Sequence, residues 1–92
     1  MKTKVVFKKI YWFNGENPIV EINAIFPEHS RKHSNGDTLY EGYAHIGQHT
    51  EIHEDFLNLS QVGNHTIETA TEEEYKDLKT ELESIGYELE VL

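Results

Sequence analysis

The chain has 92 residues, no cysteine and a formal net charge of −9. This length suits one domain with one modest hydrophobic core, because chains divide into separate cores only at roughly 250–300 residues. The absence of cysteine excludes disulfides and thiolate metal sites, and the acidic charge disfavours a nucleic-acid binder that neutralises phosphates with clustered Lys and Arg.

The first part of the chain predicts a β-hairpin. Residues 4–13 are rich in β-branched and aromatic side chains, which favour a strand. Their apolar alternation slips at Lys8 and Lys9, which predicts either a bulge or a strand that is apolar on both faces. A turn signal follows, and residues 19–26 then alternate cleanly up to Pro27, which is expected to end the second strand.

The middle of the chain predicts two loops and two further strands. Residues 28–38 are polar and contain Asn-Gly-Asp, which is typical of an exposed loop. Residues 39–46 are predicted as a third strand, in which Gly42 marks a bulge or the close approach of an aromatic neighbour. Residues 56–60 predict a weaker fourth strand, and residues 61–69 predict a second loop.

The clearest local pattern is a helix near the C-terminus. Thr71 and Glu74 form a capping box, and acidic residues fill the first turn, where the helix dipole favours them. One apolar stripe follows at helical spacing: Tyr75, Leu78, Leu82 and Ile85. Gly86 lies where a left-handed residue ends a helix, and residues 87–91 alternate as a short strand.

These elements predict a single α+β domain over residues 1–92. We expect an antiparallel β-meander of three to four strands, one C-terminal helix packed on one face, and a short terminal strand. No segment has the roughly 20 apolar residues of a membrane span, and no signal-peptide pattern is present. We therefore expect a cytoplasmic protein without a membrane partner.

Three of the six histidines lie four residues apart and suggest a metal site: His45, His49 and His53. Imidazole is a common zinc ligand, and two His at this spacing on a helix share one face. In a strand the same spacing covers about 13 Å, which is too far for one ion. A helical turn over residues 50–55 would bring His49 and His53 together. A zinc site of His45, His49, His53 and Glu54, with hydrolysis as the reaction it would support, is therefore one alternative.

Two segments of the chain are similar to known catalytic motifs, but neither matches its motif. HTEIH, at residues 49–53, resembles the zinc-protease pattern, but its glutamate lies at the wrong position. Residues 42–49 have the glycine spacing of a phosphate-binding loop, but Gln48 and His49 replace the required Lys and Ser/Thr. The residues therefore predict neither a catalytic set nor an organic cofactor.

Charge is unevenly distributed along the chain. Residues 1–13 hold four lysines and no acid, whereas residues 68–92 hold nine acids against two lysines. Acidic helix faces are usually solvated, but such a face can also imitate the phosphates of DNA and occupy the basic groove of a DNA-binding protein. An acidic DNA mimic is thus a second alternative, with these residues as its charged face: Glu72, Glu73, Asp77, Glu81, Glu83 and Glu88.

Two stretches of sequence resemble a known group of proteins. The motif Y-A-H-I-G-Q-H at residues 43–49, and E-E-Y with E-L-E-S-I-G-Y within residues 73–87, are similar to a family of short uncharacterised bacterial proteins. Members of that family occur in genomes, plasmids and prophage-like elements. The resemblance implies a bacterial, cytoplasmic α+β protein, and it implies no particular reaction.

We predict a non-enzymatic domain that binds another protein or a second copy of itself. A Gly-His-Gln run after a strand suits contact with a partner, because loops held by a rigid scaffold commonly carry function. The candidate binding residues are Tyr43, His45, Gly47, Gln48 and His49.

Overall fold

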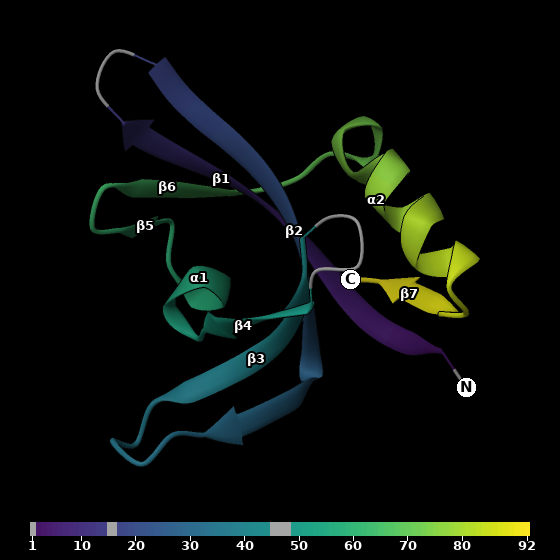
Figure 1. Ribbon diagram of the computed structural model, residues 1–92, viewed down its shortest axis with the longest axis horizontal. Helices are drawn as coiled ribbons and strands as arrows, with labels where there is room; N and C mark the ends of the chain where they lie inside the picture. Colours follow the sequence, from purple (N-terminus) through teal and green to yellow (C-terminus); the bar gives the residue numbers. More distant parts are fainter. Residues whose placement is uncertain (1, 15–16, 45–48) are drawn as a thin grey trace.

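The computed structural model describes residues 2–14, 17–44 and 49–92, with the backbone alone for residues 13, 14, 17 and 18. In chain order the elements are β1 (Thr3–Asn14), β2 (Asn17–Lys32), β3 (Thr38–Tyr43), β4 (His49–His53), α1 (Asp55–Asn58), β5 (Gln61–Val62), β6 (His65–Thr69), α2 (Glu72–Ser84) and β7 (Leu89–Val91) (Figure 1).

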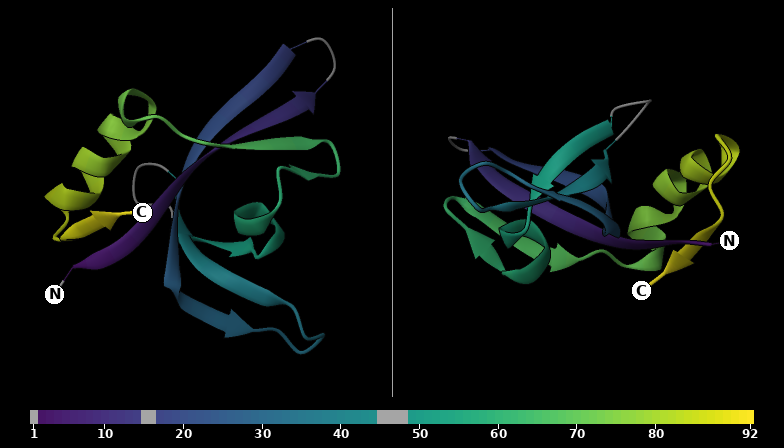
Figure 2. Two further views of the ribbon diagram at one scale, coloured as in Figure 1. Left: turned by 180° about the vertical axis from the view of Figure 1, so that it is seen from behind. Right: turned by 90° about the horizontal axis from the view of Figure 1, so that it is seen from below.

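The strands form one strongly curved sheet that resembles half of a barrel. Its order is β4-β3-β2-β1-β6-β5, with antiparallel neighbours, and β7 adds to β1 in parallel. Helix α2 lies beside β7 on one side of the sheet, whereas α1 lies on the other side next to β4 and β5 (Figure 2). The α+β prediction is confirmed at this level. The sheet, however, has seven strands rather than three or four.

Strand β1 is apolar on both faces, which was one of the two predicted outcomes. Its register with β2 is continuous from Val6 opposite Ile25 to the end of the hairpin, so the described residues contain no bulge at the lysine pair. Phe7 lies in the cluster under α2, and Ile10 is buried on the opposite face against Ile67 of β6. A central strand that is covered on both faces needs apolar residues at odd as well as even positions.

The bulge lies in β2 instead. Phe26 is opposite Glu41, and Ser30 is opposite Tyr40, so three residues of β2 have no opposite residue in β3. The prediction that Pro27 ends this strand was therefore wrong. A bulge accommodates Pro27 because its missing N–H interrupts the ladder only locally, and β2 continues to Lys32.

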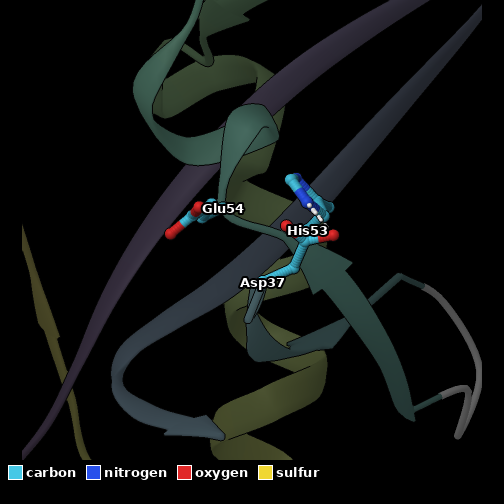
Figure 3. A group of neighbouring side chains, drawn as sticks. All are labelled: Asp37, His53 and Glu54. Atoms are coloured by element: carbon cyan, nitrogen blue, oxygen red, sulfur yellow. Dashed lines mark ion pairs between the residues drawn. The ribbon is translucent and has the colours of Figure 1, made fainter. Parts of the chain in front are cut away.

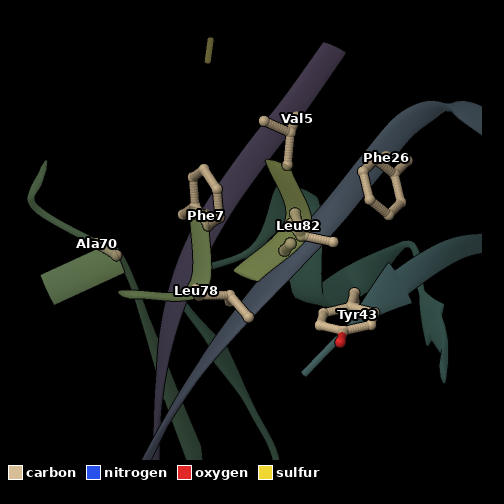
Figure 4. Close-up of a cluster of buried hydrophobic side chains, with 8 residues drawn as sticks. Val5, Phe7, Phe26, Tyr43, Ala70, Leu78 and Leu82 are labelled. Carbon is tan, nitrogen blue, oxygen red and sulfur yellow. The ribbon is translucent and has the colours of Figure 1, made fainter. Parts of the chain in front are cut away.

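The main core lies between α2 and the sheet (Figure 4). Leu82 and Leu78 of α2 point into this cluster, whose members are Val5, Phe7, Ala24, Phe26, Tyr43, Ala70, Leu78 and Leu82. Phe7 stacks on Tyr75 with ring centroids 4.2 Å apart. Each large apolar side chain buried here contributes about 1.5–3 kcal/mol to folding.

Helix α2 follows its sequence pattern closely. The capping box between Thr71 and Glu74 is present in both directions, and Gly86 has φ +113° after the helix end. Ile85 departs from the prediction, because it lies at the C-cap and is 53% exposed rather than part of the buried stripe. Among the described residues, neither helix combines the length and apolar character needed to cross a membrane.

The predictions for three middle segments were wrong in whole or in part. Residues 56–58 lie in helix α1 rather than in a strand, and residues 28–32 of the predicted 28–38 loop belong to β2, whereas residues 33–37 form a turn as predicted. The predicted 61–69 loop is the β5–β6 hairpin, with Gly63 at φ +57° in its turn. These segments have weak local patterns, and pairing with distant strands decides their structure.

Gly42 provides the first test of this packing. A methyl group at this position would lie 2.6 Å from Ile52 Cδ1 and 3.1 Å from the Ala24 carbonyl oxygen. The expected close approach is therefore present, but an isoleucine rather than an aromatic ring makes it. We expect Gly42→Ala to lower the free energy of unfolding by about 1–3 kcal/mol, because the added carbon overpacks the site.

Ile52→Val removes the atom that clashes, so it supplies the matched control. Urea denaturation followed by circular dichroism should show that the double variant loses less stability than the sum of the two single variants. Simple additivity of the two losses would contradict a clash between these side chains.

Candidate functional site

The predicted binding residues do not form one described surface. Tyr43 is 1% exposed and belongs to the core, where its ring lies edge-on to His49 at 5.1 Å. His49 begins β4 directly opposite Tyr43 and is exposed. The remaining predicted residues, His45, Gly47 and Gln48, lie outside the residues that the structure describes.

The structure does not bring His49 and His53 together. They are the first and last residues of β4, so the chain between them is extended rather than helical. Four residues of strand span about 13 Å, which exceeds the reach of one shared metal ion. His53 instead lies next to carboxylates from two other parts of the chain.

His53 joins the turn before β3 to the start of α1 (Figure 3). Its Nε2 is 3.3 Å from Asp37 Oδ2, and its Nδ1 accepts a hydrogen bond of 3.1 Å from the backbone N–H of Asp55. Asn35 orients Asp37, since its amide nitrogen donates to Asp37 Oδ2 at 3.0 Å and its oxygen accepts from the Asp37 backbone N–H. Strand pairing brings these segments together, because Leu39 is opposite His53.

This cluster has the composition of a metal site but is arranged as a hydrogen-bonded one. One ligand atom each from Asp37, His53 and Glu54 lies within 4.8 Å of the others. Because Nδ1 of His53 accepts from the Asp55 N–H, the neutral ring carries its proton on Nε2, the nitrogen that faces Asp37. A metal ion at Nε2 would have to displace that proton. In Figure 3 the Glu54 carboxylate also points to the side, away from the Asp37–His53 pair.

A groove of about 460 Å³ lies between β2 and α2. Strand β2 pairs with β1 along the whole hairpin but meets β3 only from Ala24 onward. The outer edge of residues 19–23 therefore has no strand partner within the described part of the chain. Apolar and acidic side chains line the groove: Val20, Ile22, Leu78, Glu74, Asp77 and Glu81, together with Glu21 and Ala44.

One carboxylate of the acidic groove wall forms an ion pair with the sheet. Glu74 forms an ion pair with Lys9 of β1. The hydrogen bond from Lys9, followed by those from Thr71, lowers the pKa of the Glu74 carboxyl from about 4.5 to about 2. The same pair raises the pKa of Lys9. Asp77 and Glu81 add two further carboxylates along the same wall.

Sequence reasoning missed Asp37 as the neighbour of His53 and missed the groove altogether. The Asn-Gly-Asp turn was visible, but placing Asp37 beside His53 required the register between β3 and β4. The groove required knowing that β2 extends past the end of β3. Neither fact is encoded in a local pattern.

Comparison of the chain with protein-family models, with curated proteins and with solved structures gave no match in any of the three. The resemblance to short bacterial proteins therefore stays a prediction.

The ion pair between Glu74 and Lys9 makes the free energy of unfolding depend on pH in the acid range. Because the pKa of Glu74 is lowered on folding, the stabilisation is complete above pH 4.5 and is lost as pH falls toward about 2. We expect Glu74→Gln to flatten the slope of unfolding free energy against pH in this window, measured by urea denaturation. Glu73→Gln, an exposed neighbour on the same helix turn, should keep the slope, and an equal effect of both variants would contradict this assignment.

Proposed function

We propose that this protein is a non-enzymatic binding domain that accepts an extended, basic segment of a partner protein along the outer edge of β2. The observation that supports this proposal is the edge of residues 19–23, which has no strand partner among the described residues and borders the groove against α2.

A strand edge offers backbone groups to an incoming chain. The outward N–H and C=O groups of such an edge pair readily with an added strand, and this pairing supplies affinity in many peptide complexes. Val20 and Ile22 lie on the face of β2 that looks toward α2, and Leu78 lies across from them. Alternate side chains of an added strand would contact these apolar groups.

Large apolar side chains are exposed on both faces at the end of the β1–β2 hairpin. Ile19 and Val20 are each 46% exposed, and Trp12, opposite Ile19 in the hairpin, is 42% exposed. Because side chains alternate along a strand, Ile19 and Trp12 lie on the opposite face from Val20, so of these three Val20 belongs to the surface beside α2.

Charge favours a basic partner over a second copy of this chain. Glu74, Asp77 and Glu81 line the α2 wall, and the whole chain carries a charge of −9. Such a field attracts Lys- and Arg-bearing segments and speeds their association. Pairing two copies through this edge would place two acidic walls together. Asp77 and Glu81 also belong to the acidic face considered as a DNA mimic, whose natural partner would likewise be basic.

A labelled peptide with alternating Val and Lys tests the proposal by fluorescence anisotropy. We expect it to bind, and we expect its affinity to fall at high salt, because added ions screen the charges. The same peptide with Glu in place of Lys should not bind. Amide hydrogen exchange should show new protection in residues 19–23, and protection confined to another edge would overturn the proposed site.

Asp77→Lys is the matched charge variant for this groove. Reversing this exposed charge should lower the affinity for the Val/Lys peptide several-fold, because attraction becomes repulsion. Glu73→Lys makes the same charge change on the same helix but lies outside the groove lining, so it should have a smaller effect. Equal losses in both variants would show that net charge, and not this groove, determines binding.

A divalent cation at Asp37, His53 and Glu54 is the second candidate, supported by the closeness of their ligand atoms. Of the four metal ligands predicted from the sequence, this arrangement keeps His53 and Glu54. Zinc would have to replace the proton on His53 Nε2, so its binding should strengthen as pH rises.

Native mass spectrometry after EDTA treatment and addition of stoichiometric zinc tests the metal candidate. We expect one zinc ion to be retained, and we expect His53→Ala and Asp37→Asn to abolish its retention. His49→Ala removes an imidazole from the far end of β4 and should leave the ion bound. A metal-free spectrum, or zinc that survives the His53 change, would refute this candidate.

A further inference from the structure

A second hollow of about 340 Å³ lies on the other face of the sheet, inside its curve. Strand register places side chains from β1, β2 and β4 on this face, and α1 contributes one ring. Its walls, which also include His53, Ala44 and two glutamates, are formed mainly by these residues: Ile10, Trp12, Asn23, Thr50, Ile52 and Phe56. This volume falls within the range of about 300–1,000 Å³ that small-molecule sites occupy.

One side of the cavity is aromatic and held in place by a histidine. The His65 ring lies edge-on to Trp12 at 4.5 Å and to Phe56 at 5.6 Å. His65 Nδ1 lies 3.1 Å from the Val62 carbonyl oxygen, which can only accept, so Nδ1 carries the proton. This bond fixes the histidine between the two rings. Trp12 is nevertheless 42% exposed, so its surface is open to a ligand.

The other side of the cavity has unmet hydrogen-bonding capacity. Thr50 Oγ1 is buried and has no hydrogen-bond partner among the described residues, which is uncommon in folded proteins. Asn23, which is only 6% exposed, is a buried polar residue in the same wall. A ligand with polar hydrogens would satisfy the threonine oxygen and would lie beside the Asn23 side chain.

The charged residues at the cavity favour a cation. Glu21 shares a face with Asn23 and lines the cavity, and no ion pair to Glu21 is found among the residues described. Glu51 also borders the cavity, but Arg31 donates to both of its carboxylate oxygens at 2.5 and 2.7 Å. Lys8, opposite Asn23 on this face, is not part of the lining.

We infer that this cavity binds a small organic cation that joins an apolar ring to a primary ammonium group. The ring would pack against Trp12, Phe56 and the two isoleucines. The ammonium group would donate to the Glu21 carboxylate and to the oxygens of Asn23 and Thr50. A cation near the tryptophan face gains further attraction from the ring electrons.

Trp12 makes this inference directly measurable, because it is the only tryptophan of the chain. We would titrate the protein with 2-phenylethylammonium, with neutral 2-phenylethanol and with anionic 3-phenylpropionate, following tryptophan fluorescence. The ammonium compound should give a saturable change, the alcohol should bind more weakly, and the anion should bind least. Equal affinities, or no saturable change with the ammonium compound, would overturn the inference.

Two variants separate charge from hydrogen bonding. Glu21→Gln should lower the affinity for the ammonium compound about tenfold, because a hydrogen bond between charged groups is lost. The affinity for the alcohol should not change. Glu68→Gln removes an exposed carboxylate that lines neither hollow and should have no effect. An equal loss in both variants would contradict a specific role for Glu21.

Thr50→Val tests the hydroxyl by two measurements, the stability of the ligand-free protein and the affinity for the ammonium compound. Replacing a buried hydroxyl that lacks a partner by a methyl group should raise the melting temperature of the ligand-free protein. The same change should weaken the ammonium compound, since one acceptor is lost. A variant that melts higher but binds equally well would exclude Thr50 from the site.

Binding in this cavity can be distinguished from binding in the groove on the opposite face. Glu21 and Ala44 border both hollows, so Asp77→Lys provides the separating control. It should weaken the basic peptide in the groove and leave binding of 2-phenylethylammonium unchanged.

Discussion

The pairing of β1 with β2 is the interaction on which the rest of the structure depends. These two long strands share a continuous register, and every other layer is added to them. Val5 and Phe7 on one face receive α2, while Ile10 on the opposite face packs toward β6. The two faces of one hairpin thus support two separate apolar clusters, and each cluster borders one of the two hollows. A change in the register of this hairpin by one residue would exchange the faces and disrupt both clusters.

The unequal lengths of neighbouring strands generate the candidate binding features. Strand β2 has 16 residues, whereas β3 has six and β4 has five, so β2 extends past its neighbour and keeps part of its edge uncovered. The bulge after Phe26 lets the same strand bend with the curve of the sheet. Curvature creates the concave face, and excess length creates the open edge. Both follow from β2 rather than from a specialised loop.

The sequence predicted those elements whose information is local. Helix α2 carries its own capping box, charged first turn and terminal glycine, so it could be recognised without knowledge of its neighbours. The hairpin formed by residues 4–13 and 19–26 was recognised from its residue composition and alternation. The β5–β6 hairpin and α1 could not be recognised, because their few apolar residues acquire a role only when they meet β1 and β4. His53 illustrates the same limit, since its neighbour Asp37 follows from strand register and not from sequence spacing.

The parallel pairing of β7 with β1 has a consequence for how the chain folds during synthesis. Thr3 is opposite Leu89, and the Leu92 N–H donates to the Val5 carbonyl oxygen, so β1 is completed by a strand that is synthesised much later. Until α2 and β7 leave the ribosome, the edge of β1 near Val5 lacks this partner, and Leu78 and Leu82 are not yet available to cover its apolar face. A long strand that is apolar on both faces is a preferred substrate for association with other nascent chains. The lysines around it, including Lys2, Lys4 and Lys8, counter that tendency with charge during this waiting period.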